Sequence, residues 1–279
     1  MKKNPYKTYF SPAKLNLFFK VIKKREDGFH EIASLYQAID VGDYIHVRKS
    51  NKDSFSSDFK LPFDDSNLIY KALKLFREKT KQKFFVDIIL DKNIPVQAGL
   101  GGGSSNAATT LFALNEMANN PLSIQELKDL GAIIGSDVSF FLSSGTAFCT
   151  GRGEIIEDVL FQPLDFFIAK PSFGLCTKKV YQNVDLNLLE KRDHKKILDA
   201  FLMGNHEFFN DLEISSFSIE PKLKMVRDLL LKCGFEKVCM TGSGTAFFCF
   251  KNLDVNKIEG LTLFKSKAIF RKDPFWYSK

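Results

Sequence analysis

The stretch that decides the fold runs from Pro95 to Asn106 and reads Pro-Val-Gln-Ala-Gly-Leu-Gly-Gly-Gly-Ser-Ser-Asn. Four of the five residues from Gly99 to Gly103 are glycines. They separate a predicted strand at 84–90 from a predicted helix that begins near Ser104 or Ser105. A backbone without side chains can approach a polyanion closely and point successive N–H groups at it. The helix adds unpaired N–H groups and the positive end of its dipole. We therefore predict a phosphate-binding loop.

Two common phosphate loops do not match this stretch. A Walker A loop needs Gly-Lys before Ser or Thr, and the chain has no Gly-Lys dipeptide. The dinucleotide-binding pattern would need glycine at position 104, where Ser104 stands. A flexible glycine linker remains as an alternative, although a linker would hardly be anchored between an apolar strand and a helix that carries Leu111 and Leu114.

The composition is that of an ordinary globular protein. The chain has 279 residues, 44% of them hydrophobic and 26% charged, which excludes wholesale disorder and fibrous repeats. Its net charge of +7 comes from 33 lysines and only 7 arginines. Because base and phosphate recognition usually uses the arginine fork, we expect no nucleic-acid partner. An RNA-binding module based on the basic cluster at 191–196 is an alternative, and a positive field also suits a small anion.

The cysteines and histidines offer little for covalent or metal chemistry. Five cysteines form no C-x-x-C pair and there is no H-E-x-x-H motif, so we expect neither a disulfide framework nor a metal site built from protein ligands. No stretch resembles a signal peptide or a membrane span. We expect a soluble, cytoplasmic protein without a membrane partner.

The remaining pattern mixes strands and helices without a regular βαβ rhythm, which favours the α+β class. Period-two alternation places Leu15, Leu17, Phe19 and Val21 on one face of a strand, opposite Lys14. Other strands are expected at 31–40, 44–49, 166–170, 237–240 and 246–250, and a loop at 50–57. Helices are expected at about 66–79, from a capping box at 123–126 to about 135, and at 195–203 and 221–233. Another short helix should start at 136–137.

Five segments together resemble a family of small-molecule kinases. They are Ser11-Pro12-Ala13-Lys14-Leu15-Asn16-Leu17, Asp27-Gly28-Phe29-His30-Glu31, the glycine loop, Gly135-Ser136-Asp137-Val138-Ser139-Phe140-Phe141 and Met240-Thr241-Gly242-Ser243-Gly244. Their order is that of the GHMP superfamily, named after galactokinase, homoserine kinase, mevalonate kinase and phosphomevalonate kinase. The first two segments resemble in particular the members that act on a cytidyl substrate.

The resemblance implies a two-domain α+β fold. Residues 1–152 would form a nucleotide-binding domain that resembles the second domain of ribosomal protein S5 and carries the phosphate loop. Residues 153–279 would form a ferredoxin-like, substrate-binding domain. The implied reaction transfers the γ-phosphoryl group of ATP, with Mg²⁺, to the 2-hydroxyl of 4-diphosphocytidyl-2-C-methyl-D-erythritol, in the non-mevalonate isoprenoid pathway. The implied partners are these two small molecules, and the chain would be a monomer or a weak homodimer. A sister kinase for another alcohol is the alternative.

The resemblance also implies a catalytic pair. Asp137, at a predicted helix start, would accept or orient the hydroxyl proton, and Lys14 would keep Asp137 ionised and stabilise charge in the transition state. Spacing alone favours a plain helix-start acid for Asp137, and a solvated strand lysine is the usual explanation for Lys14. Asn16 maps onto the acceptor side of the site.

The resemblance places further residues around the two substrates. Phe29 and Tyr181 would stack on the faces of cytosine, His30 would read the base edge, and Thr177 would touch the substrate. The residues expected to bind ATP are Asn67, Pro95, Gly99, Leu100, Gly101, Gly102, Gly103, Ser104 and Ser105. For Asn67, helix capping is an equally good explanation. The loop at 241–245 would brace the phosphate loop or contact substrate phosphates, if it is more than a bare turn.

Overall fold

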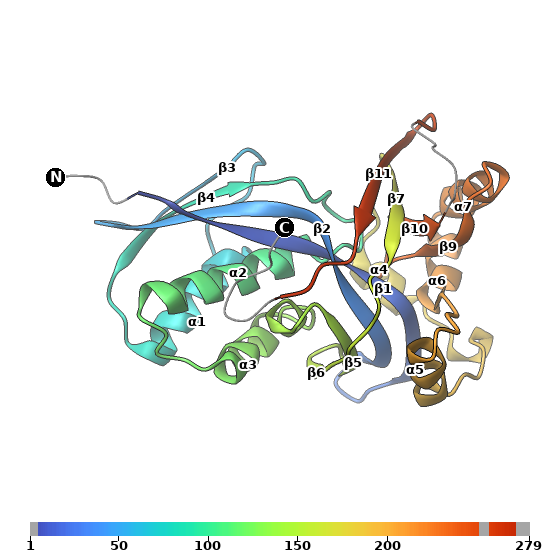
Figure 1. Cartoon of the computed structure of the whole chain (residues 1–279), viewed down its shortest axis with the longest axis horizontal. Helices are drawn as coiled ribbons and strands as arrows, with labels where there is room; N and C mark the ends of the chain where they lie inside the picture. The colour runs from blue at the N-terminus through green and yellow to red at the C-terminus, as the bar shows by residue number, and fades with distance from the viewer. Residues whose placement is uncertain (1–4, 251–256, 272–279) are drawn as a thin grey trace.

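The computed structural model of the molecule describes residues 5–250 and 257–271. Two long strands form its centre. Strand β1 (Lys7–Lys24) pairs antiparallel with β2 (His30–Ser50), and both run through the centre of the molecule (Figure 1). The sequence predicted a break in β2 at Gly42-Asp43, and this was wrong. A register shift between Pro12 and Ala13 accommodates the irregularity, so the strand continues.

A second irregularity in β1 changes which side chains share a face. The register with β2 shifts between Asn16 and Phe18. As a result, Phe18 joins the apolar cluster that contains Leu15 and Leu17, whereas Phe19 belongs to another cluster. The predicted alternation was therefore wrong beyond Leu17. An extra residue in one strand moves all the following side chains to the opposite face.

The first sheet has seven strands and carries three helices on one face. Its order is β3-β4-β2-β1-β8, while β5 pairs with β2 and β6 pairs with β5. The further strands are β3 (Ser54–Ser57), β4 (Phe85–Asp91), β5 (Thr146–Gly151), β6 (Ile155–Asp158) and β8 (Phe209–Asn210). The covering helices are α1 (Leu68–Thr80), α2 (Gly102–Met117) and α3 (Ile124–Ile134), followed by the short 3₁₀ helix η1 (Ser139–Leu142) (Figure 1). The predicted loop at 50–57 thus contains β3.

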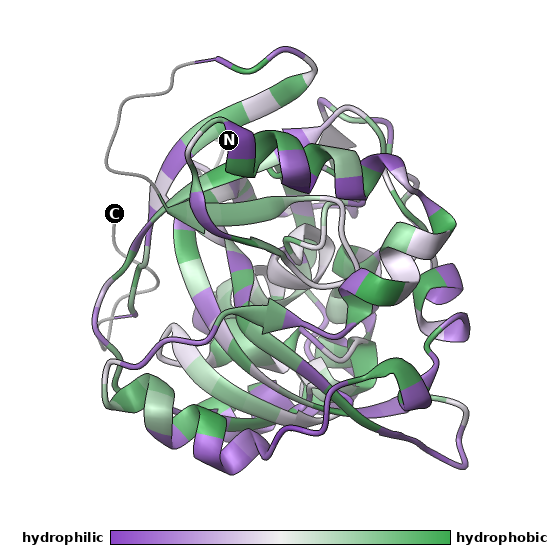
Figure 2. Cartoon of the chain, turned by 90° about the vertical axis from the view of Figure 1, so that its right-hand side faces the viewer, coloured by the Kyte–Doolittle hydropathy of each residue, from purple (hydrophilic) through white to green (hydrophobic). Residues whose placement is uncertain are grey.

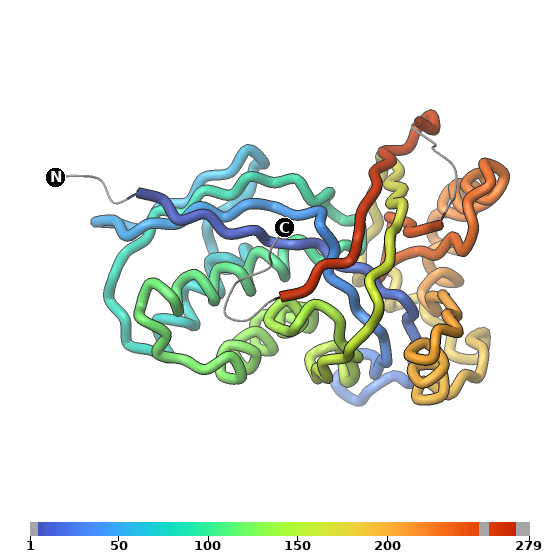
Figure 3. The backbone as a smooth tube through the Cα atoms, in the orientation of Figure 1, coloured from blue at the N-terminus to red at the C-terminus, as the bar shows by residue number. Residues whose placement is uncertain are grey.

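The second sheet is antiparallel and has an apolar cluster on each face. Its order is β11 (Leu261–Lys267), β7 (Asp165–Pro171), β10 (Phe247–Phe250), β9 (Glu236–Met240), and β7 and β11 cross the long strands (Figure 3). Successive side chains of β7 enter different clusters, because strand residues alternate between faces. The elements packed against these clusters are α4 (Thr177–Gln182), α5 (His194–Leu202), α6 (Leu212–Ile219) and α7 (Lys222–Lys232); the short helix η2 (Leu186–Leu188) lies between α4 and α5.

The helices are amphipathic, and several begin as the sequence predicts. Hydrophobic and hydrophilic residues alternate along the helices at the rim of the molecule (Figure 2). Asn67 caps α1 by accepting a hydrogen bond from the Ile69 N–H, and the capping box of Ser123 and Glu126 is formed at α3. Both predicted caps are confirmed. Helix α2 begins at Gly102, slightly earlier than predicted.

The second half of the chain contributes strands to both sheets, and the α+β class is confirmed. Strand β8 pairs with β1, and the Ile269 N–H donates to the Ala38 carbonyl, so late parts of the chain complete the first sheet. The strands up to β6 and also β8 belong to the first sheet, whereas β7, β9, β10 and β11 form the second. The division of the chain into domains after residue 152 stays a prediction.

No helix in the part of the chain that the structure describes has the length and apolarity needed to cross a bilayer.

Candidate active site

The glycine-rich loop connects β4 to α2 and lies against several fixed neighbours. Gly99 and Gly101 have φ angles of +78° and +71°, a left-handed conformation that favours glycine. A β-carbon on Gly101 would lie 3.0 Å from Lys14 Cγ and from a ring carbon of Phe141. Gly101 is also the N-cap of α2 and offers no side-chain hydrogen bond to the helix. The loop therefore needs glycine for both conformation and space, which disfavours a flexible linker.

The loop at 241–245 braces the glycine loop from the second sheet. A β-carbon on Gly99 would stand 2.1 Å from the Thr241 carbonyl oxygen, and the Ala246 N–H donates to the Ala98 carbonyl at 3.0 Å. Gly242 and Ser243 also line the neighbouring cavity. Of the roles predicted for this loop, bracing is the one that the structure shows.

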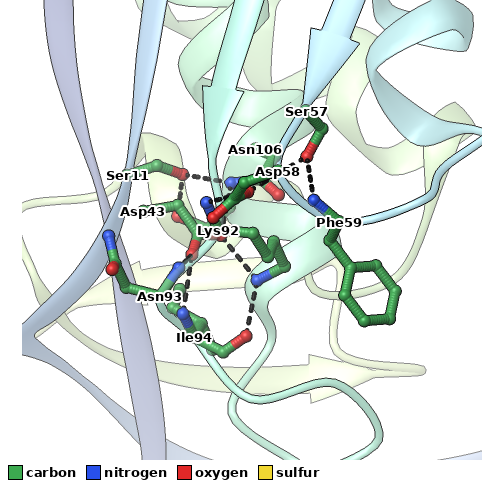
Figure 4. A network of polar contacts seen from close by, with 10 residues as sticks. Ser11, Asp43, Ser57, Asp58, Phe59, Lys92, Asn93, Ile94 and Asn106 are labelled. Atoms are coloured by element: carbon green, nitrogen blue, oxygen red, sulfur yellow. Dashed lines mark hydrogen bonds and ion pairs between the residues drawn. The ribbon is translucent and has the colours of Figure 1, made fainter.

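A buried carboxylate ties together the two ends of the glycine loop (Figure 4). Asp43 accepts hydrogen bonds from the N–H groups of Asn93 and Ile94, both at 2.7 Å, and from Asn106 Nδ2 at 2.8 Å. It also forms an ion pair of 2.7 Å with Lys92. Because both charges are buried, removal of either partner alone should cost about 3–5 kcal/mol of stability. Asp43 therefore fixes the segment before the loop relative to the helix after it.

The two serines after the glycines lie in different environments. Ser104 lines the cavity, whereas Ser105 is fully buried and does not line it. The Ser11 hydroxyl donates to Ser105 Oγ at 2.8 Å, and the Ser105 N–H donates to the Gly101 carbonyl. The hydroxyl of Ser105 thus belongs to an internal network, away from the position expected for a phosphate donor.

A cavity of about 970 Å³ begins at the glycine loop and extends to Phe29. This volume is at the upper end for ligand sites, with room for more than one small molecule. Apart from Asn16 and Ser105, all the predicted site residues line it: Lys14, Phe29, His30, Asn67, Pro95, Gly99, Leu100, Gly101, Gly102, Gly103, Ser104, Asp137, Thr177 and Tyr181. The fold therefore gathers segments that lie far apart in the sequence around one space.

Lys14 and Asp137 meet at the wall of this cavity. Lys14 Nζ lies 3.6 Å from Asp137 Oδ2 and donates to Asn16 Oδ1 at 2.6 Å. The Lys14 side chain is only 3% exposed, so it is not a solvated strand lysine, whereas that of Asp137 is 30% exposed. Burial lowers the pKa of Lys14, and the charge of Asp137 acts in the opposite direction. The pair combines a buried cation with a carboxylate that a ligand can reach.

The backbone around this pair differs from the prediction in one respect. Asp137 lies in a turn between α3 and η1, and the expected helix at 136–137 is replaced by the four-residue 3₁₀ helix η1. A helix dipole therefore has little influence on the Asp137 carboxylate. The neighbouring Lys14 ammonium is the stronger electrostatic partner.

Asn16 is fully buried on β1 and reaches the cavity only through Lys14. Its backbone N–H donates to Thr241 Oγ1 at 3.0 Å, and its Nδ2 donates to Ser34 Oγ at 3.0 Å. With its Oδ1 accepting from Lys14, every polar group of the side chain is engaged inside the protein.

Aromatic side chains gather at the other end of the cavity. Phe29 is 52% exposed, and the Arg152 guanidinium lies 5.0 Å from its ring centroid. The rings of His30 and Tyr181 are 5.5 Å apart. Burial, followed by the charge of Lys24, lowers the pKa of His30, which keeps its ring neutral near pH 7. Such a neutral ring has one donor and one acceptor nitrogen for a base edge.

Two further contacts concern predicted ligand residues. Thr177 Oγ1 and Ser243 Oγ lie 2.8 Å apart, which joins the start of α4 to the bracing loop. Asn67 donates from Nδ2 to the Pro62 carbonyl at 2.7 Å and also caps α1. Capping is thus observed for Asn67, and its contact with adenine stays a prediction.

Sequence reasoning missed several residues of the cavity wall. Tyr36, Lys92 and Arg152 all line the cavity. No motif marks Tyr36 or Lys92, whereas Arg152 lies between Gly151 and Gly153, and a pair of glycines so close together is typical of a turn. Within residues 5–250 and 257–271, no three His, Cys, Asp or Glu side chains are grouped closely enough to hold a metal ion.

Comparisons with known proteins identify relatives of the chain. The family model "GHMP kinases N terminal domain" matches residues 67–147. The 4-diphosphocytidyl-2-C-methyl-D-erythritol kinase of Protochlamydia amoebophila (strain UWE25) is 45% identical over 96% of this chain and 92% of its own length. The chloroplastic kinase of the same name from Arabidopsis thaliana is 39% identical over 97% of this chain and 76% of its own length. The crystal structure of a 4-(cytidine 5'-diphospho)-2C-methyl-D-erythritol kinase has a TM-score of 0.75 and 33% identity, over 88% of this chain and 90% of that chain.

Proposed function

The chain belongs to the 4-diphosphocytidyl-2-C-methyl-D-erythritol kinases within the GHMP family, and we propose that Lys14 and Asp137 carry out its phosphoryl transfer. It is an ATP-dependent kinase of the isoprenoid pathway, and its acceptor is the 2-hydroxyl of the methylerythritol part of that substrate. The products are the 2-phosphate and ADP. The assignment of these two catalytic residues rests on one observation: Lys14 and Asp137 form a pair at the cavity wall, between the glycine loop and the aromatic end.

Each member of the pair has a defined part in the transfer. The acceptor oxygen forms a bond to the γ-phosphorus while the bond from that phosphorus to the bridging oxygen of ADP breaks. Asp137 accepts the proton that the hydroxyl loses, or orients that hydroxyl for attack. Lys14 stabilises the negative charge on the transferring phosphoryl group, and its burial makes this interaction stronger than it would be in water.

The glycine loop receives the polyphosphate of ATP. The N–H groups at the start of α2, beginning at Gly102, are available to phosphate oxygens because Gly101 supplies no capping side chain. We place adenine near Asn67 and Pro95, which line the same part of the cavity wall as Leu68 and Val96.

A magnesium ion fits this site when it is held mainly by phosphate oxygens and water. Among the described residues, no three His, Cys, Asp or Glu side chains are grouped to hold a metal ion. The carboxylates that line the cavity are Asp27 and Asp137, and Asp137 lies beside Lys14. Mg²⁺ commonly binds nucleotides through one or two carboxylates with several waters. The ion would neutralise part of the phosphate charge, and Asp137 and Ser104 are the side chains suited to hold it.

The aromatic end receives cytosine. We place the base between Phe29 and Tyr181, with His30 at its edge and Thr177 beside the rest of the substrate. The exposed ring of Phe29 and the neutral ring of His30 support this placement. Asn16, which does not line the cavity, acts by holding Lys14.

We propose a cytoplasmic monomer or weak homodimer without nucleic-acid or membrane partners. No disulfide joins any of the five cysteines, all of which lie in the described part of the chain, and this suits a reducing compartment. In the basic cluster at 191–196, Arg192 forms ion pairs with Glu190, Glu207 and Asp211, so its charge is largely compensated. This disfavours RNA binding.

Release of ADP by the purified chain, with each candidate alcohol in turn, tests the proposed substrate. We expect turnover with 4-diphosphocytidyl-2-C-methyl-D-erythritol and none with homoserine or mevalonate. Turnover with one of the latter and none with the cytidyl compound would overturn the assignment. A filter-binding measurement across salt concentrations checks the RNA alternative, since tight and steeply salt-dependent binding without kinase activity would favour it.

A further inference from the structure

Tyr36 lies between the two residues of the proposed catalytic pair. It is placed on β2, where it pairs with Asn16 of β1, and its side chain lines the cavity although only 2% of the residue is exposed. Its hydroxyl contacts Asp137, and its ring contacts Lys14. A single side chain therefore touches both residues.

The hydroxyl engages the oxygen of Asp137 that Lys14 does not face. Tyr36 donates to Asp137 Oδ1 at 3.2 Å, while Lys14 Nζ lies 3.6 Å from Oδ2. A carboxylate with a separate partner on each oxygen has one preferred orientation, whereas a single partner allows it to rotate. This matters for Asp137 because it lies in a turn, outside any helix or strand that would fix its direction.

The face of the Tyr36 ring contacts the Lys14 ammonium group. Lys14 Nζ lies 4.7 Å from the centroid of the Tyr36 ring, within the range of a cation–π interaction. Such contacts are stronger when the ammonium is shielded from water, as the buried Lys14 is. The ring thus offsets part of the cost of burying this charge.

The surroundings hold Tyr36 in place. The edge of its ring packs against Phe140, with centroids 5.2 Å apart. A β-carbon on Gly153 would lie 3.2 Å from the Tyr36 hydroxyl and 3.6 Å from Asp137 Oδ1, so the turn after β5 closes over this hydrogen bond. Burial, and then the charge of Asp137, raises the pKa of Tyr36 well above its usual value, so the hydroxyl remains a donor.

We propose that Tyr36 is a positioning residue for the phosphoryl transfer, which orients Asp137 through its hydroxyl and supports Lys14 through its ring. The inference rests on the proposed roles of Lys14 and Asp137. Tyr36 acts through these two residues, so its loss should affect the chemical step more than the binding of either substrate.

Tyr36→Phe separates the two contacts, because it keeps the ring and removes the hydroxyl. We expect kcat to fall about tenfold, the size expected for one hydrogen bond to a charged group, while KM for both substrates stays within about twofold. Tyr36→Leu should lower kcat further, since the ring is lost as well. Tyr9→Phe is the matched control: Tyr9 is buried on β1 and donates to Glu116 at 2.6 Å, outside the cavity, and its variant should keep the wild-type kcat.

A double-mutant cycle distinguishes positioning from general support of the fold. In an Asp137→Asn background, Tyr36→Phe should cause no further decrease in kcat, because the residue through which it acts has already been altered. Another tenfold decrease, or a wild-type kcat for Tyr36→Phe alone, would overturn the inference. If Asp137→Asn by itself leaves kcat unchanged, the proposed catalytic pair fails. If that variant is impaired and Tyr36→Phe is not, only the role of Tyr36 fails.

Discussion

Gly99 lies so close to Thr241 that a β-carbon on the glycine would stand 2.1 Å from the threonine carbonyl oxygen. Gly99 belongs to the phosphate loop after β4, and Thr241 to the loop between β9 and β10 of the second sheet. Backbone-to-backbone packing of this kind leaves no flexible side chain that could move aside. The position of the phosphate loop therefore depends on the second sheet as well as on its own strand and helix.

Gly99→Ala should damage catalysis beyond its effect on backbone strain. The matched control is Gly204→Ala: Gly204 also has a positive φ, +89°, but a β-carbon added there would meet no atom within 4 Å. In urea unfolding, Gly204→Ala should lose about 1–2 kcal/mol to the left-handed conformation, and Gly99→Ala should lose more because of the added clash with Thr241. Only Gly99→Ala should displace the loop, with a decrease of about 100-fold in kcat/KM for ATP. Equal kcat/KM values for the two variants would contradict the bracing contact.

Asp137→Ala should slow the chemical step without preventing nucleotide binding. We expect kcat to fall by a factor of about 100 or more while KM for ATP changes little, because the carboxylate acts on the acceptor hydroxyl. Steady-state kinetics with both substrates varied measures these constants. The control is Asp129→Ala, an exposed acid of α3 close in sequence, which should behave like the wild type. An unchanged kcat for Asp137→Ala would remove this residue from the mechanism.

Phe29→Ala should weaken binding of the cytidyl substrate alone. Stacking on an aromatic ring contributes about 1–3 kcal/mol per base, so we expect KM for this substrate to rise roughly 10- to 100-fold, with KM for ATP unaltered. Phe85→Ala is a close control, since Phe85 is similarly exposed and also lies under an arginine, Arg77, but outside the cavity. Loss of ATP affinity in the Phe29 variant would show that the base has been placed at the wrong end.

The stability of the enzyme should decrease in mild acid partly because of His30. Burial lowers the pKa of this imidazole, so the unfolded chain takes up its proton near pH 6.5 and the folded chain only at lower pH. The contribution of His30 is therefore fully present above about pH 6.5 and decreases as the pH falls below it. The free energy of unfolding should drop less between about pH 7.5 and pH 5.5 in His30→Gln than in the wild type. Identical decreases would contradict the proposed burial effect.

Local sequence signals predicted the parts of the site that have a strong local cause. The glycine loop between β4 and α2 was predictable because close backbone approach requires glycine, and the caps of α1 and α3 follow from local hydrogen bonding. Lys14 and Asp137 were identified through family segments that lie far apart in the chain. That Lys14 and Asp137 lie 3.6 Å apart could be learned only from the folded structure.

The remaining features depend on long-range pairing. Nothing local indicates that Tyr36 faces Asp137, or that Asp43 joins the two ends of the phosphate loop, because both contacts join segments that lie far apart in the sequence. The extra residue near Leu17 reversed the predicted faces of β1, since alternation assumes a regular pleat. Short elements such as β3 and α4 have too few residues to show a period, so they were missed.

The central claim is that one cavity holds ATP on the glycine loop and the acceptor alcohol at Lys14 and Asp137. A crystal structure with a non-hydrolysable ATP analogue and 4-diphosphocytidyl-2-C-methyl-D-erythritol tests it most directly. The account predicts triphosphate oxygens in contact with the N–H groups at the start of α2, and the 2-hydroxyl within hydrogen-bond distance of Asp137. A triphosphate bound elsewhere, with the glycine loop free of ligand, would contradict it.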